Sequence, residues 1–586
     1  MEKICLIKES ISSYPPKEDL FRPGEDFPEY LYKKNITKKD NPVYRMIRAG
    51  FEMMEFDQIN YGSSEWNPLG EIVNPGDCVL IKPNMVLHEN RSGCGTECLF
   101  TNPSLVGAVI DYVIIALKGK GKIIVGDAPL QECEFETLIE ESGYRQLIDF
   151  YIQKGVDISL VDFRNIKTYE KDGVHYLQSE EEKNGVVVSL NEESAFFDVN
   201  EKRIQNLRIT NYDPRILQGH HKKNMHEYKV SQYVLDADVI INMPKPKTHR
   251  KAGVTIALKN LVGINANKEF LPHHTLGSKA EGGDAYLHEN LLLKLANEIL
   301  DIKNQLVHDN EMNLAIEAEK FYHNLYEKGK KQSEEKYWEG SWYGNDTIWR
   351  TIADLNRILL YADKTGKMTN SIQRRQFIIG DMIVSGEREG PLEPTPVYPG
   401  VIVMGKNPVA FDQMICSLMG FDYQDIPSLS NKALFDSRYP IANGQEIQIR
   451  SNCNEWNGKS LEEIREKYSL EFQPTSGWEE KLGNRYRDKL YKKVMSSGGS
   501  VYIFGAGANG VYAADELQKH GIKVSGFCDN NEKLWGREII KDICCISLNQ
   551  TDLQIPFVIG AQSRRVEEIK KQIVEAGGHV IGVVNQ

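Results

Sequence analysis

A run of basic residues follows one predicted strand of this 586-residue chain. From Val239 to Lys268 there are six Lys or Arg residues and one His, and no Asp or Glu, although the chain has 83 acidic residues in all. Lysine ammonium groups bind phosphate and carboxylate as point charges, so a basic run in an acidic protein predicts a pocket for an anion. The alternative is that these lysines are simply solvated.

Polar side chains of this run, which follow the predicted strand Val239–Asn242, are the candidate anion-binding residues. They are Lys245, Lys247, Thr248, Lys259 and Asn260. His249 is the candidate general acid or base, because histidine titrates near neutral pH, and a plain hydrogen-bond donor is the alternative. We expect Lys245 and Lys247 to be exposed, so that their removal lowers stability by no more than about 1 kcal/mol.

Three further predicted strands also end in polar residues. Asp77–Lys82 leads to Lys82 and Asn84, Lys122–Asp127 ends in Asp127, and Phe377–Asp381 ends in Asp381. Ligands of open α/β sheets bind at the carboxyl ends of the strands. We therefore expect the four strand ends to line one cleft, with Asp127 and Asp381 as catalytic residues; the alternative is that each aspartate caps a helix.

A metal site is a further hypothesis. Glu387, a candidate substrate-binding residue beside a Gly-Pro turn, would join Asp381 in a carboxylate set that faces the lysines, as Mg²⁺ shared with a phosphate requires. Salt bridging fits the same residues equally well. Cys94 and Cys98 form only one cysteine pair with ligand spacing, so an iron–sulfur cluster is not expected.

The periodicity predicts an α/β fold. From residue 76 onwards, short aliphatic strands alternate with helices, which indicates a mainly parallel sheet covered by helices on both faces. The expected organisation is an N-terminal extension over residues 1–70, a main domain over 71–425, a linker region over 426–498 and a small domain over 499–586. The main domain should contain an antiparallel insertion near 170–235, with AFFDVN at 195–200 as one of its strands, and a helical region near 285–365.

Composition limits the function classes. A net charge of −12 argues against sequence-independent binding of nucleic acid or of an anionic membrane surface. The first residues have no apolar signal region, no aliphatic run is long enough to span a bilayer, and ten scattered cysteines are typical of reduced thiols. We expect a cytoplasmic protein whose oligomeric state the sequence does not give.

The last domain carries a dinucleotide-binding pattern. A predicted strand, Ser500–Phe504, leads to Gly505, Gly507 and Gly510, then to a helix, and a second strand ends at Asp529 and Asn530. Such glycines allow close approach of a pyrophosphate, and the acid binds a ribose hydroxyl. The alternative is a degenerate module that binds nothing.

Six motifs of the main domain resemble the domain-of-unknown-function 362 family. They are IKPN (81–84), VGDAP (125–129), PKPKTH (244–249), GVTIALKNLVG (253–263), EREGP (387–391) and PVAFD (408–412), and the resemblance covers roughly residues 40–425. Members often carry a CxxCxxCxxxCP segment, which is not in this sequence, so the iron–sulfur role inferred for some of them does not carry over. The family has no settled reaction, so the resemblance marks the site and leaves the chemistry open.

The C-terminal segment FCDNNEKLWGREI (527–539) resembles the Rossmann-like domain of surface-polysaccharide sugar acyltransferases. The resemblance implies nucleotide-sugar binding at the glycines, Asp529 and Asn530. We therefore expect a bacterial enzyme that acts on a phosphorylated or nucleotide-linked metabolite in surface-glycan biosynthesis. The alternatives are a non-catalytic nucleotide-sugar sensor or scaffold and, less favoured, a redox protein that uses NAD.

Overall fold

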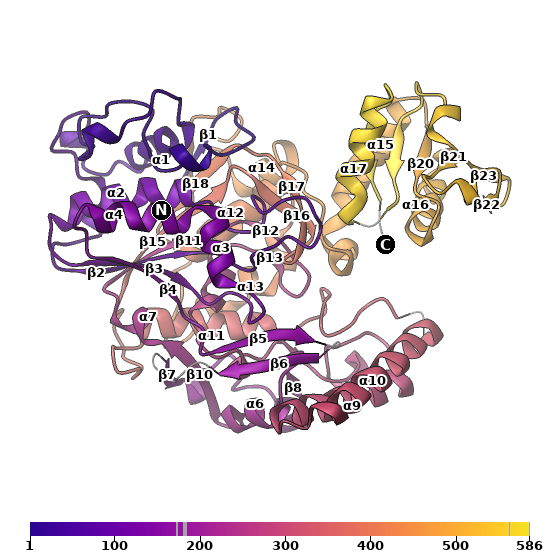
Figure 1. Ribbon diagram of the computed structural model, residues 1–586, viewed down its shortest axis with the longest axis horizontal. Helices are drawn as coiled ribbons and strands as arrows, with labels where there is room; N and C mark the ends of the chain where they lie inside the picture. The colour runs from indigo at the N-terminus through magenta and orange to yellow at the C-terminus, as the bar shows by residue number, and fades with distance from the viewer. Residues whose placement is uncertain (172–173, 180–184, 334, 562, 585–586) are drawn as a thin grey trace.

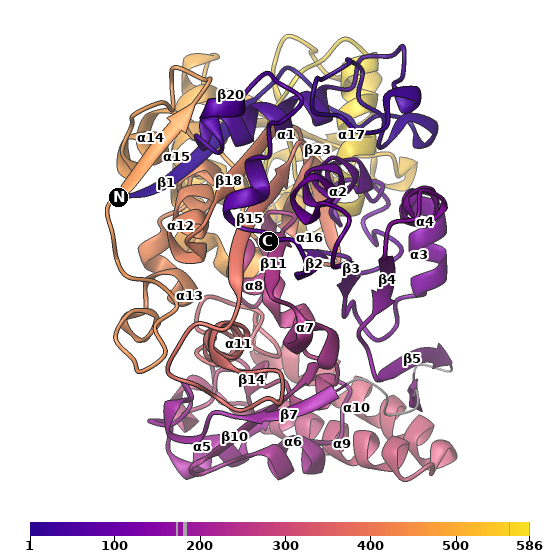
Figure 2. The same cartoon turned by 90° about the vertical axis from the view of Figure 1, so that its left-hand side faces the viewer.

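An eight-stranded sheet forms the centre of the molecule. The computed structural model describes residues 1–171, 174–179, 185–333, 335–561 and 563–584. The strand order is β19-β1-β18-β15-β11-β2-β3-β4, and Figure 2 shows β18 to β4 side by side. Strands β15 (Arg375–Met382), β11 (Val239–Met243), β2 (Cys78–Pro83), β3 (Lys122–Asp127) and β4 (Ile158–Asp162) run parallel. The predicted α/β class with a mainly parallel sheet is confirmed.

Alternating residues of the strands pack on opposite faces of this sheet. Val79 and Ile241 lie in a core with α1 (Pro42–Met53), α2 (Pro103–Leu117) and α4 (Tyr144–Gln153). Leu80 and Ile240 lie in the core of the other face, with α11 (Ile348–Tyr361) and α12 (Pro408–Met419). Because both faces are covered, the inner strands β11, β2 and β3 are mostly apolar, and their polar residues stand at or near their ends.

The N-terminal residues are part of the sheet. Strand β1 (Glu2–Lys8) pairs with β18 (Val401–Gly405) and with β19 (Ile447–Ser451). Residues 1–70 are therefore part of the main domain and not an extension of it. The predicted linker, residues 426–498, supplies the edge strand β19 and the helix α14 (Leu461–Lys467), whose Ile464 lies in the core. Both segments are integral to the fold, because their apolar side chains, such as those of ICLI (4–7), pack in the cores on the faces of the sheet.

An inserted lobe lies below the carboxyl ends of the parallel strands (Figure 1). It consists of β5 (Ile166–Lys171) to β10 (Met225–Ser231) and β14 (His274–Thr275) to α10 (Met312–Ser333). As predicted, its early strands are antiparallel and the region around 285–365 is helical, with α9 (Leu291–His308) and α10 antiparallel in Figure 1. The expected strand at 195–200 is wrong, because these residues form turns and enter α5 (Glu201–Gln205). Residues 172–173 and 180–184 of the insertion and 334 of the helical region lie outside the described residues.

The C-terminal domain has its own sheet and core. Its strand order is β22-β23-β21-β20-β24-β25, with β20 (Ser500–Phe504), β21 (Lys523–Cys528), β23 (Ile543–Ile546), β24 (Phe557–Ile559) and β25 (Val580–Val583) parallel and β22 (Glu538–Ile540) antiparallel. Helices α16 (Ala508–Lys519) and α17 (Ser563–Glu575) cover it, and α15 (Asn484–Ser496) joins its core through Leu490 and Val494. In Figure 1 it is the yellow unit at the right, with α17 on the side of β17 (Glu393–Val397). Residues 562 and 585–586 are outside the described part.

Candidate functional site

Two buried ion pairs join the ends of the parallel strands. Lys82 Nζ lies 2.7 Å from Asp127 Oδ1, and Lys245 Nζ lies 2.7 Å from Asp381 Oδ2. Each lysine stands at the carboxyl end of one strand and its aspartate at the carboxyl end of a neighbouring strand, in the order β15-β11-β2-β3. The four predicted strand ends therefore meet at one edge of the sheet.

The remaining contacts of the Lys245–Asp381 pair are also with groups of the protein. Tyr14 donates a hydrogen bond to Asp381 (2.6 Å), as does the backbone N–H of Asn102 (2.9 Å), and Lys245 also donates to the carbonyl of Val384 (2.9 Å). Both side chains are fully buried. Lys245 and Lys247 were both expected to be exposed, and both are buried. Asp381 does not line the cavity described below.

A cavity of about 810 Å³ lies between this edge of the sheet and the inserted lobe. Six of the candidate residues line it, namely Asn84, Asp127, Lys247, His249, Lys259 and Asn260. Lys82, Lys245, Thr248, Asp381 and Glu387 do not line it. Lys82 lies behind the wall, where it donates to Asp127 and, at 3.2 Å, to Asn260 Oδ1.

Thr248 and Glu387 have structural partners. The Thr248 hydroxyl donates to the carbonyl of Arg388 (2.7 Å), and Glu387 accepts from the backbone N–H of Gln473 (2.8 Å). Burial raises the pKa of Glu387. These contacts tie strand β16 (Ser385–Glu389) to the basic segment and to Gln473.

Four lysines stand in the cavity wall, and burial lowers the pKa of each. The pKa of Lys247 is about 7, because repulsion by the charge of Lys245 lowers it further. The pKa of Lys259 is also about 7, because the charges of Lys268 and Lys82 have the same effect. For Lys251 and Lys268 it is about 8. Removal of several cations from water at one place is unfavourable unless an anion compensates them.

Two further cavity residues have a buried polar atom without a partner among the residues described. They are Thr255, through its hydroxyl, and Gln131, through its amide nitrogen. Buried polar atoms are nearly always hydrogen-bonded, so these atoms are donors available to a ligand. Sequence reasoning missed Gln131, because it lies in a loop with no motif, and did not select Lys251 and Lys268 from the basic run.

His249 is held as a neutral ring. Its Nδ1 accepts from the backbone N–H groups of Lys251 (3.1 Å) and Ala252 (3.2 Å), which leaves the proton on Nε2. Burial, followed by the charge of Lys259, holds the pKa of His249 well below its usual value. In this state His249 is a hydrogen-bond donor at the cavity, which favours the plain-donor interpretation over acid–base catalysis.

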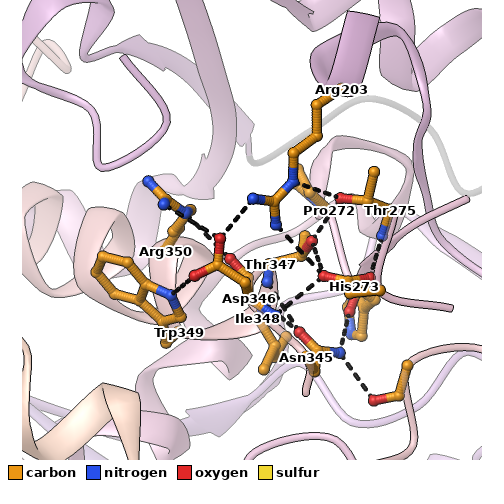
Figure 3. Close-up of polar contacts among 12 residues, drawn as sticks. Arg203, Pro272, His273, Thr275, Asn345, Asp346, Thr347, Ile348, Trp349 and Arg350 are labelled. Carbon is orange, nitrogen blue, oxygen red and sulfur yellow. Dashed lines mark hydrogen bonds and ion pairs between the residues drawn. The ribbon is translucent and has the colours of Figure 1, made fainter. Parts of the chain in front are cut away.

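A polar network supports the cavity wall from the inserted lobe (Figure 3). His273 lines the cavity, and its carbonyl accepts from Asn345 (3.0 Å). Next to it, Thr275 accepts from Arg203 (3.3 Å), whose guanidinium also pairs with Asp346 at the start of α11. This network fixes the loop that carries His273 to a helix packed on the central sheet.

The donor set does not fit Mg²⁺. Within the described residues, no three His, Cys, Asp or Glu side chains gather as metal ligands. Asp127 and Asp381 each accept from a lysine and from a backbone N–H, the latter of Met85 in the case of Asp127. Their geometry is that of the salt-bridge alternative.

The glycine loop of the C-terminal domain leaves open space beside α16. A Cβ on Gly505 would meet the Gly560 carbonyl oxygen at 2.3 Å, and one on Gly510 would meet the Gly505 oxygen at 1.9 Å, whereas nothing lies within 4 Å of one on Gly507. Asp529 accepts from the N–H of Ala506 (2.9 Å), so its carboxylate holds the loop. Asn530 donates to Gln572 (3.0 Å).

Comparison with known proteins places the main domain in one family. The model described as "Domain of unknown function (DUF362)" matches residues 79–181 and 192–417, which is more than half of the chain. A relative is the thylakoid-associated protein sll1697 of Synechocystis sp. (strain ATCC 27184 / PCC 6803 / Kazusa), 28% identical over 201 residues. That match covers 34% of this chain and 43% of the relative. No solved structure matches, and no described helix has the length and apolar composition needed to cross a membrane.

Proposed function

The chain belongs to the domain-of-unknown-function 362 family, whose description gives no reaction. From the residues of the cavity, we propose that the protein is an enzyme that acts on an anionic small molecule. The observation that carries the proposal is the cluster of Lys247, Lys251, Lys259 and Lys268 in one cavity wall. Of the carboxylates in the cavity lining, Asp127 is paired with Lys82 and Glu132 with Arg91. A phosphate or carboxylate group of a ligand would supply negative charge to the lysines.

The size of the cavity supports a metabolite larger than a free ion. A volume of about 810 Å³ is in the range of pockets that enclose whole small molecules. Apolar residues at the cavity, such as Tyr212, Val262 and Leu392, would contact an uncharged part of the ligand. A sugar phosphate or a nucleotide-linked sugar has both a charged and an uncharged part, in keeping with the surface-glycan setting that the C-terminal sequence suggests.

Calorimetric titration tests this proposal. Inorganic phosphate, pyrophosphate and a set of sugar phosphates are titrated into the full chain, its Lys247→Gln variant and the control Lys328→Gln, an exposed lysine of α10 outside the cavity wall. We expect Lys247→Gln to raise the Kd at least about tenfold, which corresponds to about 1.4 kcal/mol. Equal affinities in all three proteins, or no binding to the wild type, would reject the anion site.

We propose that the C-terminal domain binds a nucleotide at its first glycine loop. The support is the open space at Gly507 together with α16, whose N-terminus directs backbone N–H groups there. Gly507→Val should weaken UDP-sugar or NAD binding with little loss of stability, because its side chain would enter the ligand space. An unchanged affinity for whichever nucleotide binds would refute it.

A further inference from the structure

The four cavity lysines differ in what their Nζ atoms contact. Lys247 donates to the carbonyl of Leu99 (2.8 Å), Lys251 to that of Glu339, and Lys268 to that of Ala128 (3.4 Å). Lys259 has no acceptor and no carboxylate partner in the described part of the chain. Among the four cavity lysines, Lys259 is thus the one whose amine has no hydrogen-bond acceptor among the described residues.

The backbone that carries Lys259 is firmly held. Helix α8 (Ala257–Asn260) presents the N–H groups of Ala257 and Leu258 to the two carboxylate oxygens of Asp412, at 2.8 and 3.0 Å. Asn356 of α11 donates to the carbonyl of Leu258 (3.0 Å). These three hydrogen bonds hold the backbone of α8 in place, so that the side chain of Lys259 is positioned at the cavity.

We propose that Lys259 is a nucleophilic amine that forms an imine with a carbonyl group of the anionic ligand. The inference rests on the anion-binding function proposed above, since the neighbouring lysines would hold the ligand's charged group. Lys259 is the candidate because it combines access to the cavity with the lack of an acceptor that would hold it as an ammonium group.

The surroundings of Lys259 favour the neutral amine, which is the nucleophilic form. The titratable groups that face it are Lys82, Asp127, Lys247, His249, Lys268 and His273. His249 and His273 are neutral because burial holds their pKa values well below the usual one. Burial and the charges of Lys268 and Lys82 lower the pKa of Lys259 to about 7, which favours the uncharged amine.

The reaction balances with groups already at the site. The Lys259 lone pair forms the C–N bond, and the electron pair of the carbonyl moves to its oxygen. This oxygen leaves as water after it gains one proton from the attacking amine and one from a neighbouring ammonium group, for which Lys268 is suited by its pKa of about 8. The products are a protonated imine, water and a neutral Lys268.

Reductive trapping tests the inference. The full chain is incubated near pH 7 with pyridoxal 5′-phosphate, an aldehyde that carries a phosphate, and sodium cyanoborohydride, and the adducts are located by peptide mass spectrometry. We expect one dominant adduct on Lys259, slowed at least about tenfold by excess pyrophosphate. Pyridoxal, which lacks the phosphate, should react much more slowly.

The variant Lys259→Arg separates this inference from the proposed function. Arginine keeps the positive charge but has no amine of this reactivity, so phosphate should still bind while the dominant adduct disappears. If phosphate binds the wild type but the label falls on Lys247, on Lys268 or on exposed lysines, the inference on Lys259 is overturned and the anion site stands. If neither phosphate nor pyridoxal phosphate binds, both proposals fail.

Discussion

Lys245 and Lys247 are two residues apart but have different environments. Lys245 turns to Asp381 and is fully buried in an ion pair, whereas Lys247 has only uncharged acceptors and lines the cavity. A buried ion pair contributes little when intact, but loss of one partner leaves an uncompensated charge in the interior. Lys245 is therefore expected to stabilise the protein and Lys247 to bind ligand.

We predict that Lys245→Met lowers the free energy of unfolding by about 3 to 5 kcal/mol, because Asp381 then remains buried without its cation. The control is Lys364→Met, which removes a lysine from a partly exposed pair with Asp238 and should cost less than about 1 kcal/mol. Urea unfolding of both variants measures the difference. Similar small losses for the two would mean that Asp381 is not charged in the folded state.

At the scale of residues, the sequence predicted which strand ends meet but not how their charges pair. The pairing of Lys82 with Asp127 and of Lys245 with Asp381 follows from the order of the strands. Strand order depends on contacts between segments far apart in the chain, which local patterns do not encode. For the same reason, the cavity residues from the inserted lobe, such as Asn211 and Tyr212, had no local signal.

At the scale of elements, the segment after α8 closes over the Lys82–Asp127 pair. The carbonyl of Gly263 accepts from the N–H of Ala128 (2.9 Å), which draws the backbone onto the end of β3. A Cβ on Gly263 would meet Asp127 Oδ1 at 2.0 Å and Lys82 Nζ at 2.9 Å. The glycine is needed here because of this close approach.

Gly263→Ala should therefore destabilise the protein by about 1 to 3 kcal/mol and weaken phosphate binding, since the ion pair must move. Gly219→Ala is a suitable control: Gly219 lies in α6 (Pro214–His220) with nothing within 4 Å of an added Cβ. Alanine there should stabilise the helix by about 0.5 to 1 kcal/mol. Thermal unfolding with and without phosphate compares the two, and a neutral Gly263→Ala would argue against the close packing.

Aliphatic runs that end in polar residues made the parallel strands predictable, because burial of both faces leaves a continuous apolar signal. The two strands at the other end of the sheet were missed. β1 is bordered by charged residues, and β19 (IQIRS) alternates apolar and polar residues as an edge strand with one covered face does. Their place in the sheet is decided by pairing with β18 and with each other.

At the scale of the whole molecule, the boundary between the main domain and the C-terminal domain lies near residue 484. Leu490 and Val494 of α15 pack in the C-terminal core, and the hydroxyl of Tyr486 accepts from the N–H of Val583 (2.9 Å). Trp478 and Leu482, just before them, belong to the core of the main domain. The boundary therefore lies between two hydrophobic clusters rather than at the first glycine motif.

We predict that a fragment from residue 484 to 586 unfolds cooperatively and is soluble, whereas one that starts at Lys492 is less stable because it lacks Leu490. Residues 1–483 should fold alone, whereas 79–417, the span matched by the family model, should aggregate without β1 and β19. Size-exclusion chromatography and circular dichroism of the four fragments decide this. A monomeric, folded 79–417 would show that β1 and β19 are dispensable.

The position of β1 also sets an order of events during synthesis. Its partners β18 and β19 begin 393 or more residues after β1 ends at Lys8. At 5 to 20 residues per second, a ribosome needs roughly 20 to 80 s to make that stretch. The apolar segment ICLI has no strand partner during this time. The nascent chain should therefore depend on chaperones and on the helix α1, the first helix able to cover this segment.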